Sequence, residues 1–148
     1  MKKAISAIAL VIASAALAGN VKIERGIAYA ADDADQYRRE RCKLDVKVPE
    51  GKKGFSTVVW FHGGGLEGGG RHFIPIGDDI AQVAVDYRLL GKSGVQGRDC
   101  IEDAAAAVAW TLKHIAAYGG DTNKVFVSGM MWFSDTWSTT KHPKHSLL

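Results

Sequence analysis

Hydrophobic and polar residues alternate along much of the chain in patterns that predict β-strands. Leu44, Val46 and Val48 alternate with charged residues within 42–49, which is the period-2 pattern of a half-exposed strand. The run 56–62 is almost continuously apolar, as in a strand that is buried on both faces of a parallel sheet. Similar but shorter patterns predict strands within 21–26, within 79–88 and, as a short buried strand, at 124–128.

The segment 98–121 carries the clearest helical pattern. Asp99 predicts the N-cap, with Glu102 three residues later as its capping-box partner, and Gly119 and Gly120 predict the end of the helix. Because strands alternate with this long helix, the chain is expected to form an α/β fold around a parallel sheet. The predicted buried stripe of the helix consists of Ile101, Ala105, Val108, Leu112 and Ile115.

The first residues have the pattern of an export signal. Two lysines precede an uncharged apolar stretch at 4–19, and a small-x-small motif ends at Ala18. This predicts a signal peptide at 1–18 and a protein that is exported to the periplasm or secreted. A second such motif at 28–30 is disfavoured because it follows a strand-like segment. The apolar stretch is shorter than the roughly 20 residues of a membrane span, so no span is expected after cleavage.

Charge and cysteine content change this picture little. The net charge of +3 and the lack of a dense basic block give no indication of nucleic-acid binding. The most basic run, 37–43, is interpreted as a solvated entrance to the strand that follows it. In an exported protein Cys42 and Cys100 are equally compatible with a disulfide and with two buried free thiols. No Cys/His spacing indicates zinc, and no metal or cofactor is expected.

The strongest chemical signal is the sequence WFHGGGLEGGG at 60–70. A buried strand ends in His62, and three glycines follow it directly. Glycine allows backbone conformations that other residues resist, and it lets N–H groups approach a ligand closely. Donors fixed in this way can stabilise a developing negative charge on oxygen, as in an oxyanion hole.

With this motif the chain resembles the N-terminal half of α/β-hydrolase esterases and lipases of the His-Gly-Gly-Gly type, which are related to carboxylesterases and hormone-sensitive lipase. The resemblance covers roughly residues 20 to 129. It implies an α/β-hydrolase fold that is truncated after the strand leading to the nucleophile elbow. Four motifs carry the resemblance in the family's order: 61–65, 85–89, 99–110 and 118–129.

The resemblance also implies roles for individual residues. Gly64 and Gly65 would supply two N–H groups of an oxyanion hole, with His62 and Gly63 as structural support of the motif. The third donor would come from the residue after the nucleophile, here Trp132. The substrate would be a small-molecule ester, and no cofactor would be needed. Packing and hydrogen-bonding roles behind the site would fall to Asp86, Tyr87 and Arg88, and a turn-shaping role to Asp121.

The nucleophile is the point at which the chain departs from the family. Its position falls on Met131, and a thioether cannot attack a carbonyl. Ser128 lies inside the predicted strand. A triad of Ser134, Asp135 and His142 is disfavoured, because three partners from one short segment would have to converge. The remaining candidates are also interpreted as ordinary tail or structural residues: Ser138, His145, His72 and His114.

These observations predict an exported member of an ester-hydrolase lineage that is inactive as written. Its domain would span 19–129, and 130–148 would form a divergent, poorly ordered tail. The alternative is a non-catalytic protein that binds ligands with its glycine-rich loop, and a half-enzyme completed by another chain ranks third. The strand at 124–128 would form an exposed apolar sheet edge, which predicts marginal stability. The oligomeric state is left open.

Overall fold

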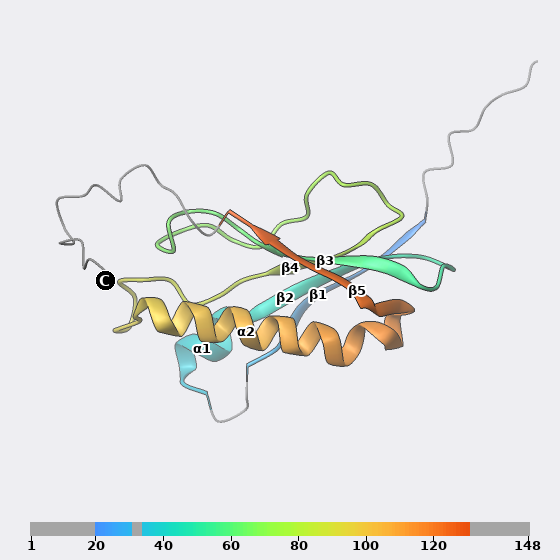
Figure 1. Cartoon of the computed structure of the whole chain (residues 1–148). Coiled ribbons are helices and arrows are strands. Elements are labelled where there is room, and N and C mark those ends of the chain that lie inside the picture. The colour runs from blue at the N-terminus through green and yellow to red at the C-terminus, as the bar shows by residue number, and fades with distance from the viewer. Residues whose placement is uncertain (1–19, 31–33, 131–148) are drawn as a thin grey trace, which may run out of the picture.

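Five strands form one mixed sheet in the order β1-β2-β4-β3-β5 (Figure 1). The computed structural model describes residues 20–30 and 34–130. β1 and β4 both pair antiparallel with β2, whereas β3 pairs parallel with β4 and with β5. The strands are β1 (Val21–Ala28), β2 (Lys43–Pro49), β3 (Phe55–Phe61), β4 (Ala81–Val85) and β5 (Gly120–Gly129). The helices are α1 (Gln36–Arg41), α2 (Gly97–His114) and the 3-10 turn η1 (Ile115–Tyr118).

All five strand regions are confirmed, but the expectation of a parallel sheet is wrong for one half of it. β4 lies between β2 and β3, so the strand that follows β2 in the chain does not pair with it. The long loop 62–80 allows β3 and β4 to run parallel, because a parallel pair needs a crossover of a dozen or more residues. Hydrophobic periodicity reports burial and carries no information about strand direction.

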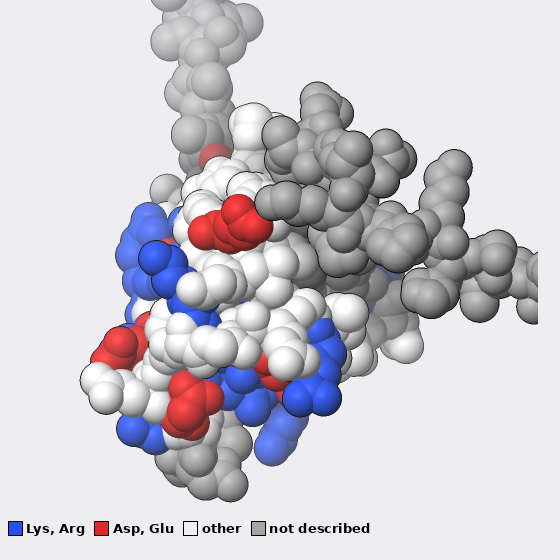
Figure 2. Space-filling view, turned by 90° about the vertical axis from the view of Figure 1, so that its left-hand side faces the viewer, with Lys and Arg blue, Asp and Glu red and all other residues white. Residues whose placement is uncertain are grey.

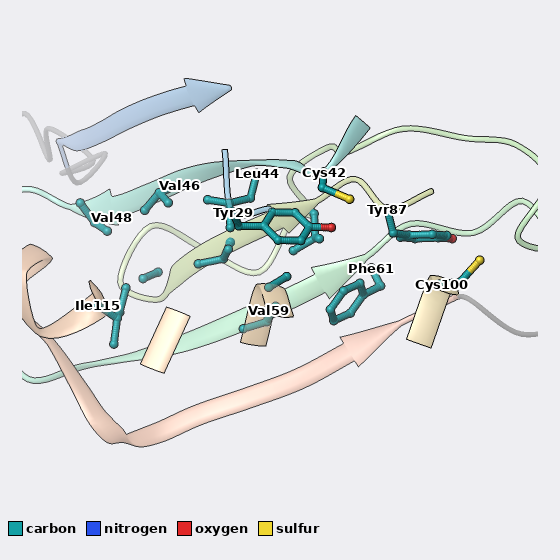
Figure 3. Packing of buried hydrophobic residues seen from close by; sticks show 14 of the residues in the cluster. Tyr29, Cys42, Leu44, Val46, Val48, Val59, Phe61, Tyr87, Cys100 and Ile115 are labelled. Carbon is teal, nitrogen blue, oxygen red and sulfur yellow. The ribbon is translucent and has the colours of Figure 1, made fainter. Parts of the chain in front are cut away.

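The hydrophobic core lies between the sheet and α2. Both helices cover the same face of the sheet, and the loop after β3 lies on the other side (Figure 1). Figure 3 shows side chains of β2 and β3 packed into this core together with Ile115. β3 buries alternate residues and leaves the others half-buried, so it is not covered equally on both faces. The labelled core includes Leu44, Val46, Val48, Val59 and Phe61.

The buried face of α2 differs from the predicted stripe. Ile115 is buried as expected, but Ile101 is 61% exposed and Leu112 is 45% exposed. The small side chains on the observed face allow α2 to approach the sheet closely, and the polar ones have partners: Thr111 Oγ1 donates to the carbonyl of Ala107 at 2.9 Å. The residues of α2 that are buried are Cys100, Asp103, Ala107 and Thr111.

The start of α2 is also corrected. Gln96, not Asp99, is the N-cap residue, and Asp99 occupies the third helical position. There its carboxylate accepts a hydrogen bond from the Gln96 N–H at 2.7 Å, so Asp99 caps the helix from inside the first turn. Glu102 is not part of the cap. The predicted end is confirmed, since Gly119 adopts a left-handed conformation with φ of 98°.

A buried ionic triad joins both helices to the segment after β4. Asp103 of α2 is fully buried and accepts hydrogen bonds from Arg88 Nε at 2.7 Å and Arg88 Nη2 at 2.8 Å. Arg38 Nε of α1 lies 3.0 Å from Oδ1 of the same carboxylate. The basic run 37–43 is therefore not a solvated strand entrance. It forms α1, and two of its arginines, Arg38 and Arg41, point into the structure.

Both cysteines are free and buried, so the structure favours the thiol alternative over the disulfide. Cys100 Sγ donates to the carbonyl of Arg88 at 3.1 Å. Burial raises the pKa of Cys42 to about 11. A thiol that is neutral and enclosed in this way is a poor nucleophile, and both residues act as small core side chains.

β5 forms one edge of the sheet. The predicted strand at 124–128 lies in its second half, and this half is largely exposed, so the prediction of a buried strand is wrong. Phe126 is 57% exposed and Val127 is 58% exposed, which confirms the expected apolar edge. Nothing within the described residues covers this edge, because β3 is the only strand that pairs with β5 there. Among residues 20–30 and 34–130, no helix has both the length and the apolar content to span a membrane.

Replacing Asp103 is expected to destabilise the fold strongly. Asp103→Ala leaves Arg88 and Arg38 without their shared carboxylate, and breaking a buried pair typically costs about 3 to 5 kcal/mol. Urea unfolding followed by circular dichroism measures this loss. Glu102→Ala is the matched control on the same helix, because that side chain is 61% exposed and lies 3.9 Å from Arg88. A change of similar size in both variants would contradict the structural role of the triad.

Candidate functional site

The glycine loop (residues 63–70) begins where β3 ends, and it lies beside the end of β5. Met130 follows β5, and its N–H donates to the carbonyl of Phe61 at 3.0 Å. A Cβ added to Gly63 would lie 3.2 Å from the Cβ of Met130. The structure thus brings the residue before the predicted nucleophile position next to the glycine loop.

Gly129 makes this closeness of β5 and β3 possible. A Cβ at position 129 would lie 2.7 Å from the carbonyl oxygen of Phe61, which is closer than real Cβ atoms come. A larger residue would therefore push β5 away from β3 at the point where the two strands reach the site.

The glycine loop has a backbone conformation that few other residues tolerate. Gly64 has φ of +117°, Gly65 of +63° and Gly69 of +95°. The loop closes on itself, since the N–H groups of Glu67 and Gly68 both donate to the carbonyl of Gly64, at 3.0 and 3.1 Å. A Cβ on Gly64 would collide with the backbone of Gly68. The sequence is glycine-rich at these points because the backbone needs both the positive φ and the space.

Two N–H groups near the start of this loop are candidate donors to a ligand, because they have no acceptor in the part of the chain that the structure describes. They belong to Gly64, which is exposed, and to Gly65, which is half-buried. The N–H groups of Gly63, Leu66, Gly69 and Gly70 also lack an acceptor among the described residues, whereas the carbonyl of Leu66 accepts from the N–H of Leu90 at 2.7 Å. Unpaired donors in a turn that is closed by its own hydrogen bonds are suited to an oxygen ligand.

His62 fixes the start of the glycine loop and is shielded from solvent, with 1% of its surface exposed. Its ring stacks on Tyr87 with centroids 4.5 Å apart, and the Tyr87 hydroxyl donates to the His62 carbonyl at 2.8 Å. Its Nδ1 lies 2.7 Å from the carbonyl of Gly63, and its Nε2 lies 3.5 Å from Asp86 Oδ1. A ring that is enclosed in this way braces the backbone and is not available as a base for a substrate.

Asp86 directly follows β4 and binds the residues on both sides of the loop. We call Asp86, His62, Arg41 and Arg71 the Asp86 cluster. Arg71 donates its N–H to Asp86 Oδ1 at 2.7 Å and its Nη1 to Oδ2, and Arg41 Nη2 lies 3.4 Å from Oδ1. Burial alone would raise the pKa of Asp86, but the hydrogen bonds and charges of its three partners outweigh burial and keep this pKa below its ordinary value of 3.8.

Arg71 joins the cluster to a second carboxylate. Its Nε donates to Asp45 Oδ1 of β2 at 2.7 Å, and Arg25 of β1 binds the other oxygen of Asp45 at 2.9 Å. Figure 2 shows the end of the molecule at which β3, β4 and β5 finish, where basic and acidic side chains border a central area without charged residues. Arg41, Arg71 and Asp45 were missed by the sequence reasoning. The only signals were an arginine directly after the last glycines and the basic run 37–43.

Several predicted residues are not brought to the loop by the described structure. Met131 and the whole alternative triad of Ser134, Asp135 and His142 lie outside the described residues, as do Trp132, Ser138 and His145. Ser128 lies on β5, opposite Trp60 of β3. His72 is exposed and contacts Trp60, and His114 stacks on Trp110. Asp121 Oδ1 accepts from the N–H of Asn123 at 2.9 Å at the start of β5.

The five-stranded mixed sheet, the crossover helix between β4 and β5 and the glycine loop after β3 define an α/β-hydrolase fold, of which this chain contains the N-terminal part. The sequence model of the BD-FAE family matches residues 44–131, more than half of the chain. The chain therefore belongs to this family. The predicted resemblance to α/β-hydrolase esterases and lipases is confirmed.

Similar proteins agree with this assignment. Esterase E4 of Myzus persicae is 32% identical over 87 residues, which are 51% of this chain and 16% of the esterase. Bile salt-activated lipase of Rattus norvegicus is 30% identical over 120 residues, 64% of this chain and 20% of the lipase. Among solved structures, a PNB esterase superposes with a TM-score of 0.61 at 22% identity, covering 74% of this chain and 34% of its own, and this likeness shows the fold.

The Asp86 cluster is expected to make the fold sensitive to acid. Because folding lowers the pKa of Asp86, its contribution to stability is complete above pH 3.8 and is lost as the pH falls through the lower pKa of the folded state. Unfolding free energies measured in urea from about pH 6 to about pH 2.5 test this. Asp86→Asn should flatten the acid decline. Asp79→Asn, whose side chain is 80% exposed, should leave it unchanged. Equal slopes in wild type and Asp86→Asn would contradict the assignment.

Proposed function

We propose that the glycine loop is the oxyanion-binding part of an ester-hydrolase site of the serine acyl-transfer type. The carrying observation is the pair of N–H groups at Gly64 and Gly65, which have no acceptor among the described residues and lie in a loop beside the end of β5. Membership in a family with esterase and lipase relatives supports an ester-hydrolase lineage. The chain spans about a fifth of those relatives or less, so activity, substrate and export of the whole protein remain part of the proposal.

In this reading the chain supplies charge stabilisation for acyl transfer. The N–H groups of Gly64 and Gly65 donate to the carbonyl oxygen of a small ester. They donate more strongly once that oxygen carries negative charge in the tetrahedral intermediate. One such donor is worth roughly 3 kcal/mol in the transition state. His62 and Gly63 do not react, and they fix the backbone from which the two donors project.

The same reading makes the chain inactive as written. Attack on the carbonyl requires an activated hydroxyl or thiol, and the nucleophile position is Met131. Cys42 and Cys100 are buried, and Ser128 pairs with β3 as part of β5. A thioether has no proton to lose and forms no acyl intermediate under these conditions, so binding of the carbonyl oxygen is not followed by bond cleavage.

A second function is favoured by the same two donors. A non-catalytic protein could use the glycine loop to bind the carboxylate of a short acyl chain. A carboxylate oxygen resembles the oxyanion in charge and size, and two free N–H groups suit it without any nucleophile. An ester hydrolase must turn its substrate over, whereas a binding protein needs only to hold its ligand.

The chain is expected to show no turnover of p-nitrophenyl butyrate above a buffer control. The reason is the missing nucleophile at position 131. Release of p-nitrophenol, followed by absorbance with purified protein, measures this. A mock purification without the chain is the control for contaminating hydrolase, and a phosphonate inhibitor of serine hydrolases shows whether any turnover depends on a serine. Turnover that copurifies with the chain and is blocked by the phosphonate would overturn the proposed inactivity.

Binding of butyrate is expected to depend on Gly64. Gly64→Ala should weaken binding about tenfold, because the added Cβ collides with Gly68 and displaces one donor. Gly77→Ala is the matched control. Gly77 has a similar positive φ of +87°, but its added Cβ would meet no atom within 4 Å. Butyrate titration followed by NMR of the glycine amides measures both. Equal affinity in the two variants would exclude the glycine loop as the binding site.

A further inference from the structure

We propose that Arg41 and Arg71 are positioning residues of the glycine loop, and that they keep the N–H groups of Gly64 and Gly65 in a ligand-ready orientation. The proposal rests on the proposed function of that loop and extends it to two residues outside the His-Gly-Gly-Gly motif. Neither arginine reaches the donors directly. Both act through the backbone and the carboxylates at the ends of the loop.

Arg41 binds the far end of the loop from α1. Its Nη2 donates to the carbonyl of Gly69 at 2.7 Å, and its Nε donates to the carbonyl of Tyr87 at 3.1 Å. The same Nη2 lies 3.3 Å from His62 Nε2. One planar guanidinium therefore connects α1, the segment after β4 and both ends of the glycine loop. An arginine is suited to this task because its donors form a rigid fork.

Arg71 anchors the residue directly after the loop. Its N–H and its guanidinium both bind Asp86, and its Nε binds Asp45. Asp86 follows β4 and Asp45 lies on β2, and these two strands are neighbours in the sheet. The end of the loop is thus tied to the rigid centre of the sheet by charge-assisted bonds, which are stronger than neutral ones.

The middle of the loop depends on these two ends. Among the described residues, the only backbone bond from 63–70 to another segment joins the Leu66 carbonyl to the N–H of Leu90. Leu66 itself has φ of +66°, a conformation that is strained for a residue with a side chain. A strained turn persists only when its surroundings enforce it. Without fixed ends, the loop would relax and the donors of Gly64 and Gly65 would turn away.

The charges of the arginines have a second consequence. Asp86 lies 3.5 Å from His62 Nε2, so a negative carboxylate stands directly behind a loop that is proposed to bind a negative oxygen. Arg41 and Arg71 offset this charge. The side chains of Arg41 and Arg71 are only 21% and 27% exposed, so solvent screens their effect less than it would at the surface.

The test compares hydrogen exchange in five single variants of the full chain. Arg41→Ala and Arg71→Ala should each speed exchange about tenfold at the loop amides of Glu67 and Gly68 and at the Leu90 amide that donates to the loop, while sheet amides such as that of Val83 change little. Arg41→Lys should restore part of the protection. The controls are Arg39→Ala, on the same helix but bonded to Ala34, and Arg25→Ala, which shares Asp45 with Arg71.

Butyrate affinity, measured on the same samples, separates the possible failures. The proposal expects weaker binding in both test variants and unchanged binding in both controls. Loop and sheet amides that loosen together, or a loop that stays protected, would overturn the positioning role. Unprotected loop amides in the wild-type chain would overturn it as well. If the variants speed loop exchange as expected but the wild-type chain does not bind butyrate, the proposed function is overturned. The positioning role of the two arginines is then still supported.

Discussion

The carboxylate of Asp86 is the group on which the arrangement of the glycine loop depends. It is buried at the end of β4, and it can remain charged there only because His62, Arg41 and Arg71 surround it. An unpaired buried carboxylate would be costly, so the three partners are drawn to it. Two of them stand at the two ends of the loop. The contacts that keep the Asp86 carboxylate charged therefore also fix the backbone of the loop at both ends.

A second buried carboxylate organises the other side of the sheet in the same way. Asp103 binds Arg88 and Arg38, and so attaches α1 and α2 to the segment after β4. The adjacent residues Asp86, Tyr87 and Arg88 therefore serve two clusters: Asp86 and Tyr87 face the loop, and Arg88 faces α2. A fold of this size with an exposed edge at β5 buries limited apolar surface. The ionic contacts therefore help to fix the positions of the helices and the loop relative to the sheet.

The sequence predicted the strands, the helix and the glycine loop because each leaves a local signal. Alternation marks β2, glycine marks the turn, and Gly119 marks the end of η1. The sequence-based predictions were wrong or incomplete where contacts between residues far apart in the chain determine the structure. Ile101 and Leu112 fit a helical stripe, but the buried face of α2 is a neighbouring one, on which Asp103 pairs with Arg88. Arg41 and Arg71 left only weak signals in the sequence. A bond such as that from Arg41 of α1 to the Gly69 carbonyl joins distant segments and has no short-range pattern.

The measurement that tests this account most directly is amide hydrogen exchange within the glycine loop of the unmodified chain. The structure predicts a contrast between neighbours: the N–H groups of Gly64 and Gly65, which have no acceptor among the described residues, exchange rapidly, while those of Glu67, Gly68 and Leu90 are protected. That pattern requires a loop that is ordered and yet has free donors. Uniformly rapid exchange would show that the loop is not fixed, and protected glycines would show that the donors are already used.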